Sequence, residues 1–193
     1  MHPLSAGALR VLVVGFAFAF LSGAAAAAEY TIDQSHSFIQ FRISHLGFSI
    51  LNGRFDDFSG TFSWAQDAPG DSSITVDVKT ASIDTNWAER DKHVRSNEFL
   101  DVEKYPTATF KSTNYTGDAN GGKLEGTLTL HGVTKAVTLD VRAVGEGDDP
   151  LGGYRAGFRA TTSIDRTDFG ISYNLWPIAN TMEFELFIEG IRQ

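Results

Sequence analysis

The sequence predicts an all-β domain of eight antiparallel strands, and three observations support this fold class. From residue 31 onward, apolar and polar residues alternate with a period of two, as in strands that are buried on one face. Segments rich in Gly, Asp and Asn separate these stretches, as hairpin turns do. The connections are mostly short, which favours pairing between consecutive strands. Eight such strands form either a sandwich or an up-and-down barrel, and a barrel leaves no exposed edge.

Six of the predicted strands alternate regularly and two do so less strictly. The regular strands are expected at residues 39–43, 74–78, 124–130, 137–141, 154–160 and 182–188, and the less regular ones at 53–64 and 107–115. The turn segments between them include DAPGDSS, GDANGGK, HGVTK and GEGDDPLGG. An eight-stranded barrel is either just filled by side chains or able to hold one small ligand. Small residues on the apolar faces indicate room inside, although they also compensate for large residues in a packed core: Gly126, Ala156 and Ala160.

Residues 1–28 have the order of a secretory signal peptide. Arg10 precedes an apolar run at residues 11–21, and small residues follow up to Ala28, where cleavage is expected. The apolar run is short for a membrane span, which needs about 20 residues. We therefore expect an exported protein without a stable membrane anchor, whose folded domain is residues 29–193.

The composition of this domain limits its partners. A chain of this length forms one domain and buries a core without disulfides, and the sequence contains no cysteine. Without Arg10, 15 basic residues face 24 acidic ones, which gives a net charge of −9. An acidic surface argues against binding to nucleic acid and against attraction to anionic lipid headgroups.

One segment, NWAERDKHVRSNEFLDVEKYP, does not alternate and predicts helix at residues 86–104 between two strands. Asn86 is the expected N-cap, Glu89 its capping-box partner, and Pro106 ends the segment. An ordered insertion of this length in a barrel is expected to cover an open end or form a lid.

The charged residues of this segment also raise the possibility of a catalytic centre. No cysteine is present, and the serines show no nucleophile-elbow pattern. The histidines lie far apart without the spacing of metal ligands on one helix, so we expect no metal and no cofactor: His36, His45, His93 and His131. Most of the charges are expected to form salt bridges over the barrel mouth. The remaining possibility is that a few of them face the cavity and contact a polar headgroup: Arg90, His93 and Arg95.

Four blocks of the sequence resemble the YceI-like family of exported polyisoprenoid-binding proteins. They are YTIDQSHSFIQFRISHLGFSILNGRFDDFSGTF, ASIDTNWAERDKHVRSNEFLDVEKYPTATFKST, GTLTLHGVTKAVTL and SIDRTDFGI, in the order of the family. The resemblance implies a lipocalin-like barrel with a long isoprenoid chain inside, such as a quinone tail or a polyprenyl phosphate. It also implies a periplasmic location and, in many members, a homodimer.

We therefore predict a non-enzymatic binding protein that holds an isoprenoid lipid inside the barrel for transport, storage or a stress response. Two other classes stay open, namely an enzyme acting on a bound isoprenoid or quinone, and an interaction protein with a filled barrel. The ligand-binding lining is predicted to comprise Ile39, Phe41, Ile43, Val76, Val78, Phe110, Gly126, Leu128, Ala156, Phe158, Ala160, Trp176, Phe184 and Leu186.

Overall fold

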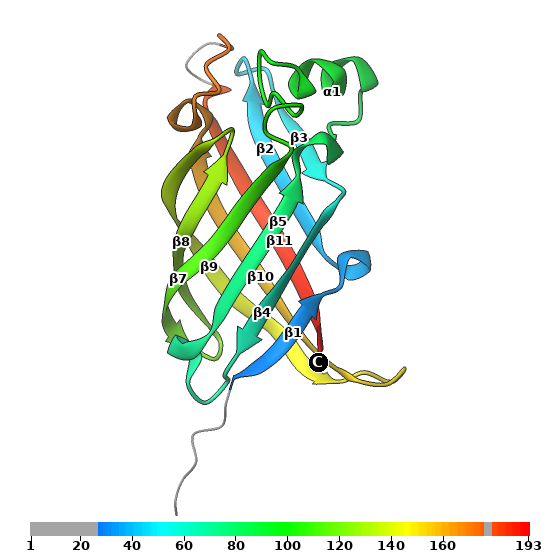
Figure 1. Ribbon diagram of the computed structural model, residues 1–193, viewed down its shortest axis with the longest axis vertical. Coiled ribbons are helices and arrows are strands. Elements are labelled where there is room, and N and C mark those ends of the chain that lie inside the picture. The colour runs from blue at the N-terminus through cyan, green and yellow to red at the C-terminus, as the bar shows by residue number, and fades with distance from the viewer. Residues whose placement is uncertain (1–26, 176–178) are drawn as a thin grey trace, which may run out of the picture.

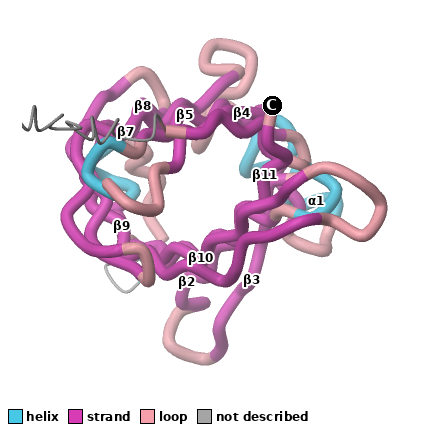
Figure 2. Tube along the Cα trace, turned by 90° about the horizontal axis from the view of Figure 1, so that it is seen from below, coloured by secondary structure: helices cyan, strands magenta, loops and turns pink. Residues whose placement is uncertain are grey.

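The strands form a closed antiparallel barrel. The computed structural model describes residues 27–175 and 179–193, so the predicted signal peptide lies almost wholly outside the described residues. Around the ring the strand order is β1, β4, β5, β7, β8, β9, β10 and β11, and β11 pairs with β1 to close it (Figure 1 and Figure 2). The strands are β1 (Ala28–Ile32), β2 (Phe38–His45), β3 (Ser49–Phe55), β4 (Phe58–Trp64), β5 (Ser73–Lys79), β6 (Ile83–Asp84), β7 (Thr107–Asp118), β8 (Gly121–Leu130), β9 (Val133–Asp148), β10 (Tyr154–Asp165) and β11 (Thr181–Arg192).

The predicted barrel of eight strands is confirmed, but three of the eight are broken in two. β1 and β2 both pair with β11 and are separated by the short 3₁₀ helix Gln34–His36. The next two broken strands follow the same division. In one half of the barrel, β4 lies between β1 and β5, and in the other half β3 lies between β2 and β6. The strand predicted at residues 53–64 is therefore interrupted at Asp56 and Asp57, between β3 and β4. The breaks explain why eight predicted strands appear as eleven segments.

An ion-pair network holds the first of these breaks in place. Arg155 on β10 donates hydrogen bonds to Asp33, which follows β1, and to Glu189 on β11, at 2.7 and 2.6 Å. It also donates to Asp149 in the β9–β10 loop. The hydrogen bond from Arg155 is the main cause that holds the pKa of Asp33 well below its usual range, and Ser35 and His36 add to it. The pKa of Asp149 is lowered by the backbone N–H of Leu151 and then by Arg155.

Replacing Arg155 with methionine is expected to lower the melting temperature at neutral pH by a few degrees. Methionine keeps much of the apolar stem but leaves three carboxylates without their shared cation. A carboxylate with a lowered folded-state pKa contributes stability above its unfolded pKa of about 3.9 and loses it as the pH falls through the folded value. The difference between the two proteins should therefore shrink below about pH 4. Thermal unfolding followed by circular dichroism at pH 7 and at pH 3 measures both effects, and an equal difference at the two pH values would contradict the account.

The inserted segment between β6 and β7 covers one end of the barrel, which we call the helix end (Figure 1). Its helix, α1 (Ala88–Arg95), is shorter than the predicted range, and residues 97–100 and 102–104 form turns instead. The predicted N-cap is wrong, because Asn86 has a positive φ of 67° and the N-cap is Trp87, which makes no side-chain cap hydrogen bond. Asp91 instead accepts hydrogen bonds from the backbone N–H and the hydroxyl of Thr85, at 2.8 and 2.5 Å. A carboxylate inside the helix thus ties its beginning to the preceding loop.

In the described part of the chain, no helix combines the length and the apolar composition needed to cross a bilayer.

Candidate functional site: an apolar cavity in the barrel

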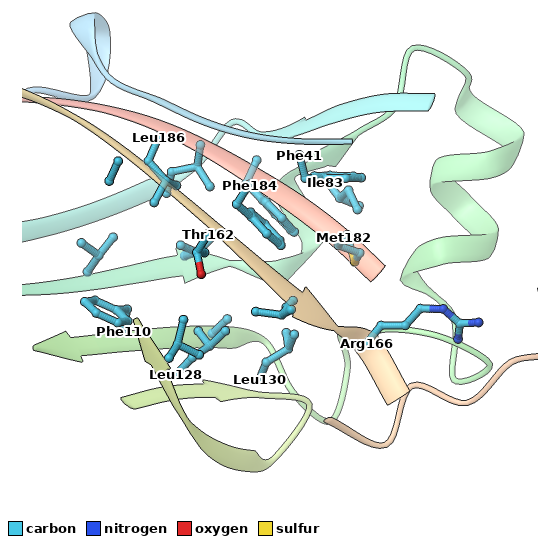
Figure 3. Close-up of a pocket in the computed structure, with 18 of the residues that line it drawn as sticks. Phe41, Ile83, Phe110, Leu128, Leu130, Thr162, Arg166, Met182, Phe184 and Leu186 are labelled. Atoms are coloured by element: carbon cyan, nitrogen blue, oxygen red, sulfur yellow. The ribbon is translucent and has the colours of Figure 1, made fainter. Parts of the chain in front are cut away.

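The barrel encloses a cavity of about 670 Å³ whose walls are almost entirely apolar side chains. Because successive residues of a strand point to opposite faces, each strand contributes every second side chain to the interior. Figure 3 shows Phe110, Leu128 and Phe184, from three different strands, pointing into this common space. Neutral carbon atoms thus form most of the cavity wall, which favours an apolar occupant over a charged one.

The structure places eleven of the predicted lining residues on the cavity wall. They are Ile39, Phe41, Ile43, Val76, Val78, Phe110, Leu128, Phe158, Ala160, Phe184 and Leu186. All belong to the inward phase of their strands, which the period-two pattern identified.

Two further predicted lining residues do not reach the cavity. Gly126 faces inward, but the ring of Phe110 lies against it, so that an added Cβ would meet Phe110 Cζ at 2.4 Å. Ala156 is only 1% exposed and belongs to a packed cluster with Tyr30 and Phe62. In both cases an aromatic side chain occupies the room that the small residue leaves. Trp176, also predicted to line the cavity, lies outside the described residues.

Aromatic rings pack at the end of the barrel opposite α1, which we call the aromatic end. Tyr30 and Phe62 stack with ring centroids 4.7 Å apart, and Trp64 meets Phe158 edge to face at 4.9 Å. The indole N–H of Trp64 donates a 2.8 Å hydrogen bond to Glu146. Tyr115 packs beside Trp64, and burial raises the pKa of its hydroxyl. Such packed rings restrict the aromatic end, where serine hydroxyls such as those of Ser63 and Ser73 are also part of the lining. The charged lining groups lie at the other end, the helix end.

Polar and charged side chains line the cavity at the helix end. They include His45, Thr85, Glu89, Arg90, His93 and Arg166. Arg90 donates hydrogen bonds from Nε to the hydroxyl of Thr85 and from an Nη to its carbonyl oxygen, at 2.7 and 2.5 Å. Its guanidinium also lies over the Trp87 ring, and among the described residues no carboxylate forms an ion pair with it. Its charge is therefore available to a polar group at this end of the cavity.

The other two predicted headgroup residues differ in position. His93 lines the cavity and bonds to Glu98 at 2.7 Å, with its ring packed against Phe99 and Tyr173. Arg95 does not line the cavity, because its guanidinium donates to the backbone carbonyls of Ala81 and Ile83. Arg95 thus joins α1 to the strand before it.

Arg166 lies buried at the same end of the cavity, as Figure 3 shows, and it is not among the residues that the sequence predicts for the site. Its guanidinium donates to the carbonyls of Ala179 and Ile171 and to the side-chain oxygen of Asn180, at 3.0, 2.5 and 3.0 Å. Burial lowers the pKa of Arg166, and the neighbouring Asp165 opposes this effect. Even so, an arginine stays protonated at neutral pH. The residue fastens the segment that follows β10 over the helix end.

The hydroxyl groups of the described lining residues are hydrogen-bonded within the protein. They bond to backbone groups, to each other or, for Thr85, to Asp91 and Arg90, as in the pair Ser63 and Ser73 at 2.9 Å. These bonds tie the few polar side chains of the wall to the barrel itself.

Two further histidines are hydrogen-bonded away from the cavity, whereas His45 is part of its lining. His131 contacts the carbonyl oxygen of Phe169 at 3.2 Å, and His36 bonds to Asp33 at 2.9 Å. Asp33, His36 and Glu189 together bring three groups of the metal-ligating kind within 4.8 Å of one another. The guanidinium of Arg155 binds both carboxylates of this group, so an ion-pair network accounts for the cluster.

Comparisons with known proteins agree with this architecture. A family model for the YceI-like domain matches residues 30–190. A UPF0312 protein of Pseudomonas aeruginosa is 49% identical over 187 residues, which cover 96% of this chain and 97% of the relative. The crystal structure of BcnA from Burkholderia cenocepacia has a TM-score of 0.74 at 21% identity, covering 82% and 98% of the two chains, and shares the fold.

A polyisoprenoid-binding domain from Saccharophagus degradans also shares the fold, with a TM-score of 0.63 at 19% identity over 86% of this chain and 99% of that one. The family match begins in β1 and ends in β11, so it includes the whole ring of strands and the cavity within it. The chain therefore belongs to the YceI-like domain family.

Proposed function

We propose that this protein is an exported, periplasmic and non-enzymatic binding protein that holds one long-chain isoprenoid lipid of the quinone or polyprenyl type. The observation that carries the proposal is the elongated apolar cavity with polar side chains at its helix end. The isoprenoid tail lies along the barrel axis against the apolar rows. The headgroup lies at the helix end, near Arg90 and His93. The polyisoprenoid-binding domain of the same fold supports this choice of ligand.

Burial of the tail supplies the free energy of binding. Each CH₂ group that leaves water contributes about 0.8 kcal/mol, so a long isoprenoid gains more than a short one while the cavity has room. The few polar contacts fix orientation, as in other ligand sites with mostly apolar walls. An acidic exterior keeps such a carrier soluble when its cargo is not.

Titration of the delipidated protein with farnesol, geranylgeraniol and solanesol is expected to show affinity that rises with chain length. Tryptophan fluorescence is a suitable signal, because Trp64 and Trp87 border the two ends of the cavity. A straight-chain alcohol of matched carbon number serves as the control for general apolar binding. Saturable binding that favours the isoprenoid supports the proposal, while equal affinity for both series or no saturation contradicts it.

A further inference from the structure

Apolar side chains are exposed around the helix end of the barrel. On the hairpin between β2 and β3, the exposed fractions of Leu46, Phe48 and Ile50 are 41, 85 and 59%. Trp87, just before α1, is 60% exposed. A soluble surface normally places such residues singly, so four at one end of the barrel call for an explanation.

The hairpin tip is a tight turn that holds Phe48 outward. Leu46 and Gly47 both have positive φ, at 53° and 78°, and the backbone N–H of Phe48 bonds to the carbonyl oxygen of His45 at 2.9 Å. Ser44 accepts a further hydrogen bond from the backbone N–H of Gly47 at 3.2 Å. The exposure of Phe48 is therefore a property of an ordered turn.

The tip and Trp87 stand on either side of the cavity mouth. Leu46 and Trp87 both line the main cavity, although both are also exposed to solvent. A smaller crevice with a volume of about 370 Å³ lies between the hairpin and the start of the helical insertion, lined by His45, Ser49, Ile50, Leu51, Asn52, Thr85, Asn86 and Arg90. The crevice is lined mostly by polar side chains, so Leu46 and Trp87 are the residues that connect the apolar cavity wall with the exposed rim.

The hairpin differs in charge from the rest of the chain. Residues 38–55 contain no aspartate or glutamate, although the sequence has 24 acidic residues. Its two arginines are neutralised by neighbours, since Arg42 pairs with Glu183 and Arg54 pairs with Asp56 and Asp84. The tip itself, residues 44–50, therefore carries only His45 as a titratable group. The tip is therefore a nearly uncharged part of an acidic protein, and a membrane surface, which is negatively charged or neutral, repels it little.

We propose that the hairpin tip, residues 44–50, docks together with Trp87 on the surface of a lipid bilayer, so that the ligand passes directly between membrane and cavity. The proposal rests on the proposed function, because an isoprenoid lipid resides in a bilayer and its apolar tail has a large cost of exposure to water. Aromatic and aliphatic side chains of this kind insert shallowly into the membrane interface, and tryptophan is enriched there.

The size of the patch favours a bilayer over a second copy of the chain. Aromatic side chains bury about 150–250 Å² each, so the four exposed residues offer on the order of 500 Å². A stable protein interface needs about 800 Å² from each partner. A bilayer has no such minimum, because shallow insertion of a few side chains suffices for transient contact.

The test compares the variant Phe48→Asp with wild type and with Leu151→Asp. Leu151 is a matched control, since it is 96% exposed in the β9–β10 loop, at the aromatic end of the barrel (Figure 1). Neither side chain lines the cavity, so both variants should keep the equilibrium affinity for dansyl-labelled geranylgeraniol. The measurements are co-sedimentation with vesicles of phosphatidylcholine and phosphatidylethanolamine, and the rate at which the labelled lipid moves from protein to vesicle.

We expect Phe48→Asp to reduce both vesicle binding and transfer rate about tenfold, while Leu151→Asp leaves both unchanged. A transfer rate that is independent of vesicle concentration and equal in all three proteins would overturn the docking proposal, because the lipid would then leave through water. Concentration-dependent dimerisation that Phe48→Asp abolishes, without any vesicle binding, would assign the patch to a second copy instead. Failure of the protein to bind the labelled isoprenoid at all would count against the proposed function, and vesicle co-sedimentation would still test the docking surface by itself.

Discussion

Replacing Ala160 with phenylalanine is expected to reduce the bound isoprenoid at least tenfold while the barrel stays folded. Ala160 lies midway along β10 and lines the cavity, opposite Leu186 on β11 and Val141 on β9. A tail that runs along the barrel axis must pass this position, and a benzyl ring there occupies its path. Because the ring enters a cavity and not a packed core, the ligand-free protein should lose little stability. The measurements are the lipid content of protein purified after expression and the melting temperature after delipidation.

The same substitution at Ala156 provides the matched control. Ala156 lies four residues earlier on the same face of β10, but it is packed among the aromatic residues of the barrel's other end. A ring added to a packed core typically costs about 1–3 kcal/mol of stability. We therefore expect Ala156→Phe to lower the melting temperature of the delipidated protein and Ala160→Phe to spare it. If Ala160→Phe destabilises the protein as much as Ala156→Phe does and still carries lipid, Ala160 belongs to a filled core and the cavity assignment is wrong.

Replacing Arg166 with methionine is expected to lower the free energy of unfolding by roughly 2–4 kcal/mol, since each buried acceptor left unpaired costs about 1–3 kcal/mol. The substitution keeps the apolar stem but removes the donors to Ala179, Ile171 and Asn180. These three residues belong to the segment that follows β10 at the helix end, so its loosening should also speed the release of ligand. Chemical denaturation and the dissociation rate of dansyl-labelled geranylgeraniol measure the two effects.

Arg166→Lys serves as the control for charge alone. Lysine retains the positive charge but cannot present the planar set of donors that reaches three acceptors at once. We expect it to recover only part of the lost stability. An Arg166→Met protein with wild-type stability and an unchanged dissociation rate would show that Arg166 does not fasten this segment.

Much of the fold follows from the alternation of side chains along the strands. Rows such as Ile39, Phe41 and Ile43 identify the inward face of a strand without any knowledge of its partners, because a strand has only two faces. The same rule placed Ala160 on the cavity wall. The rule does not distinguish Ala160 from Ala156, because both side chains point to the inner face of β10. Aromatic rings from other strands fill the space beside Ala156, and the sequence pattern of β10 does not contain this information.

The polar end of the site was less accessible to sequence reasoning. Arg90 and His93 are predicted as site residues from their place in the inserted segment. Arg166 is not predicted, although it is the only arginine in the SIDRTDFGI block. Whether its guanidinium reaches solvent or other protein groups depends on where the fold places its three acceptor residues, Ile171, Ala179 and Asn180. Residue type alone predicts Asn86 as the N-cap, whereas its positive φ places it in the loop before the helix. Both features depend on contacts with residues that are distant in the sequence, and the structural preferences of single residues do not include such contacts.

Native mass spectrometry of the protein purified from the cells that naturally produce it tests the central claim most directly. The chain should appear with one bound molecule, and the mass difference should correspond to a long-chain isoprenoid that an organic extract of the same sample also contains. The complex should lose this molecule on delipidation and regain it from a lipid extract of the same cells. A chain that appears only without ligand, even when it has never been exposed to detergent or solvent, would contradict the account and indicate that the barrel of this protein does not hold a lipid.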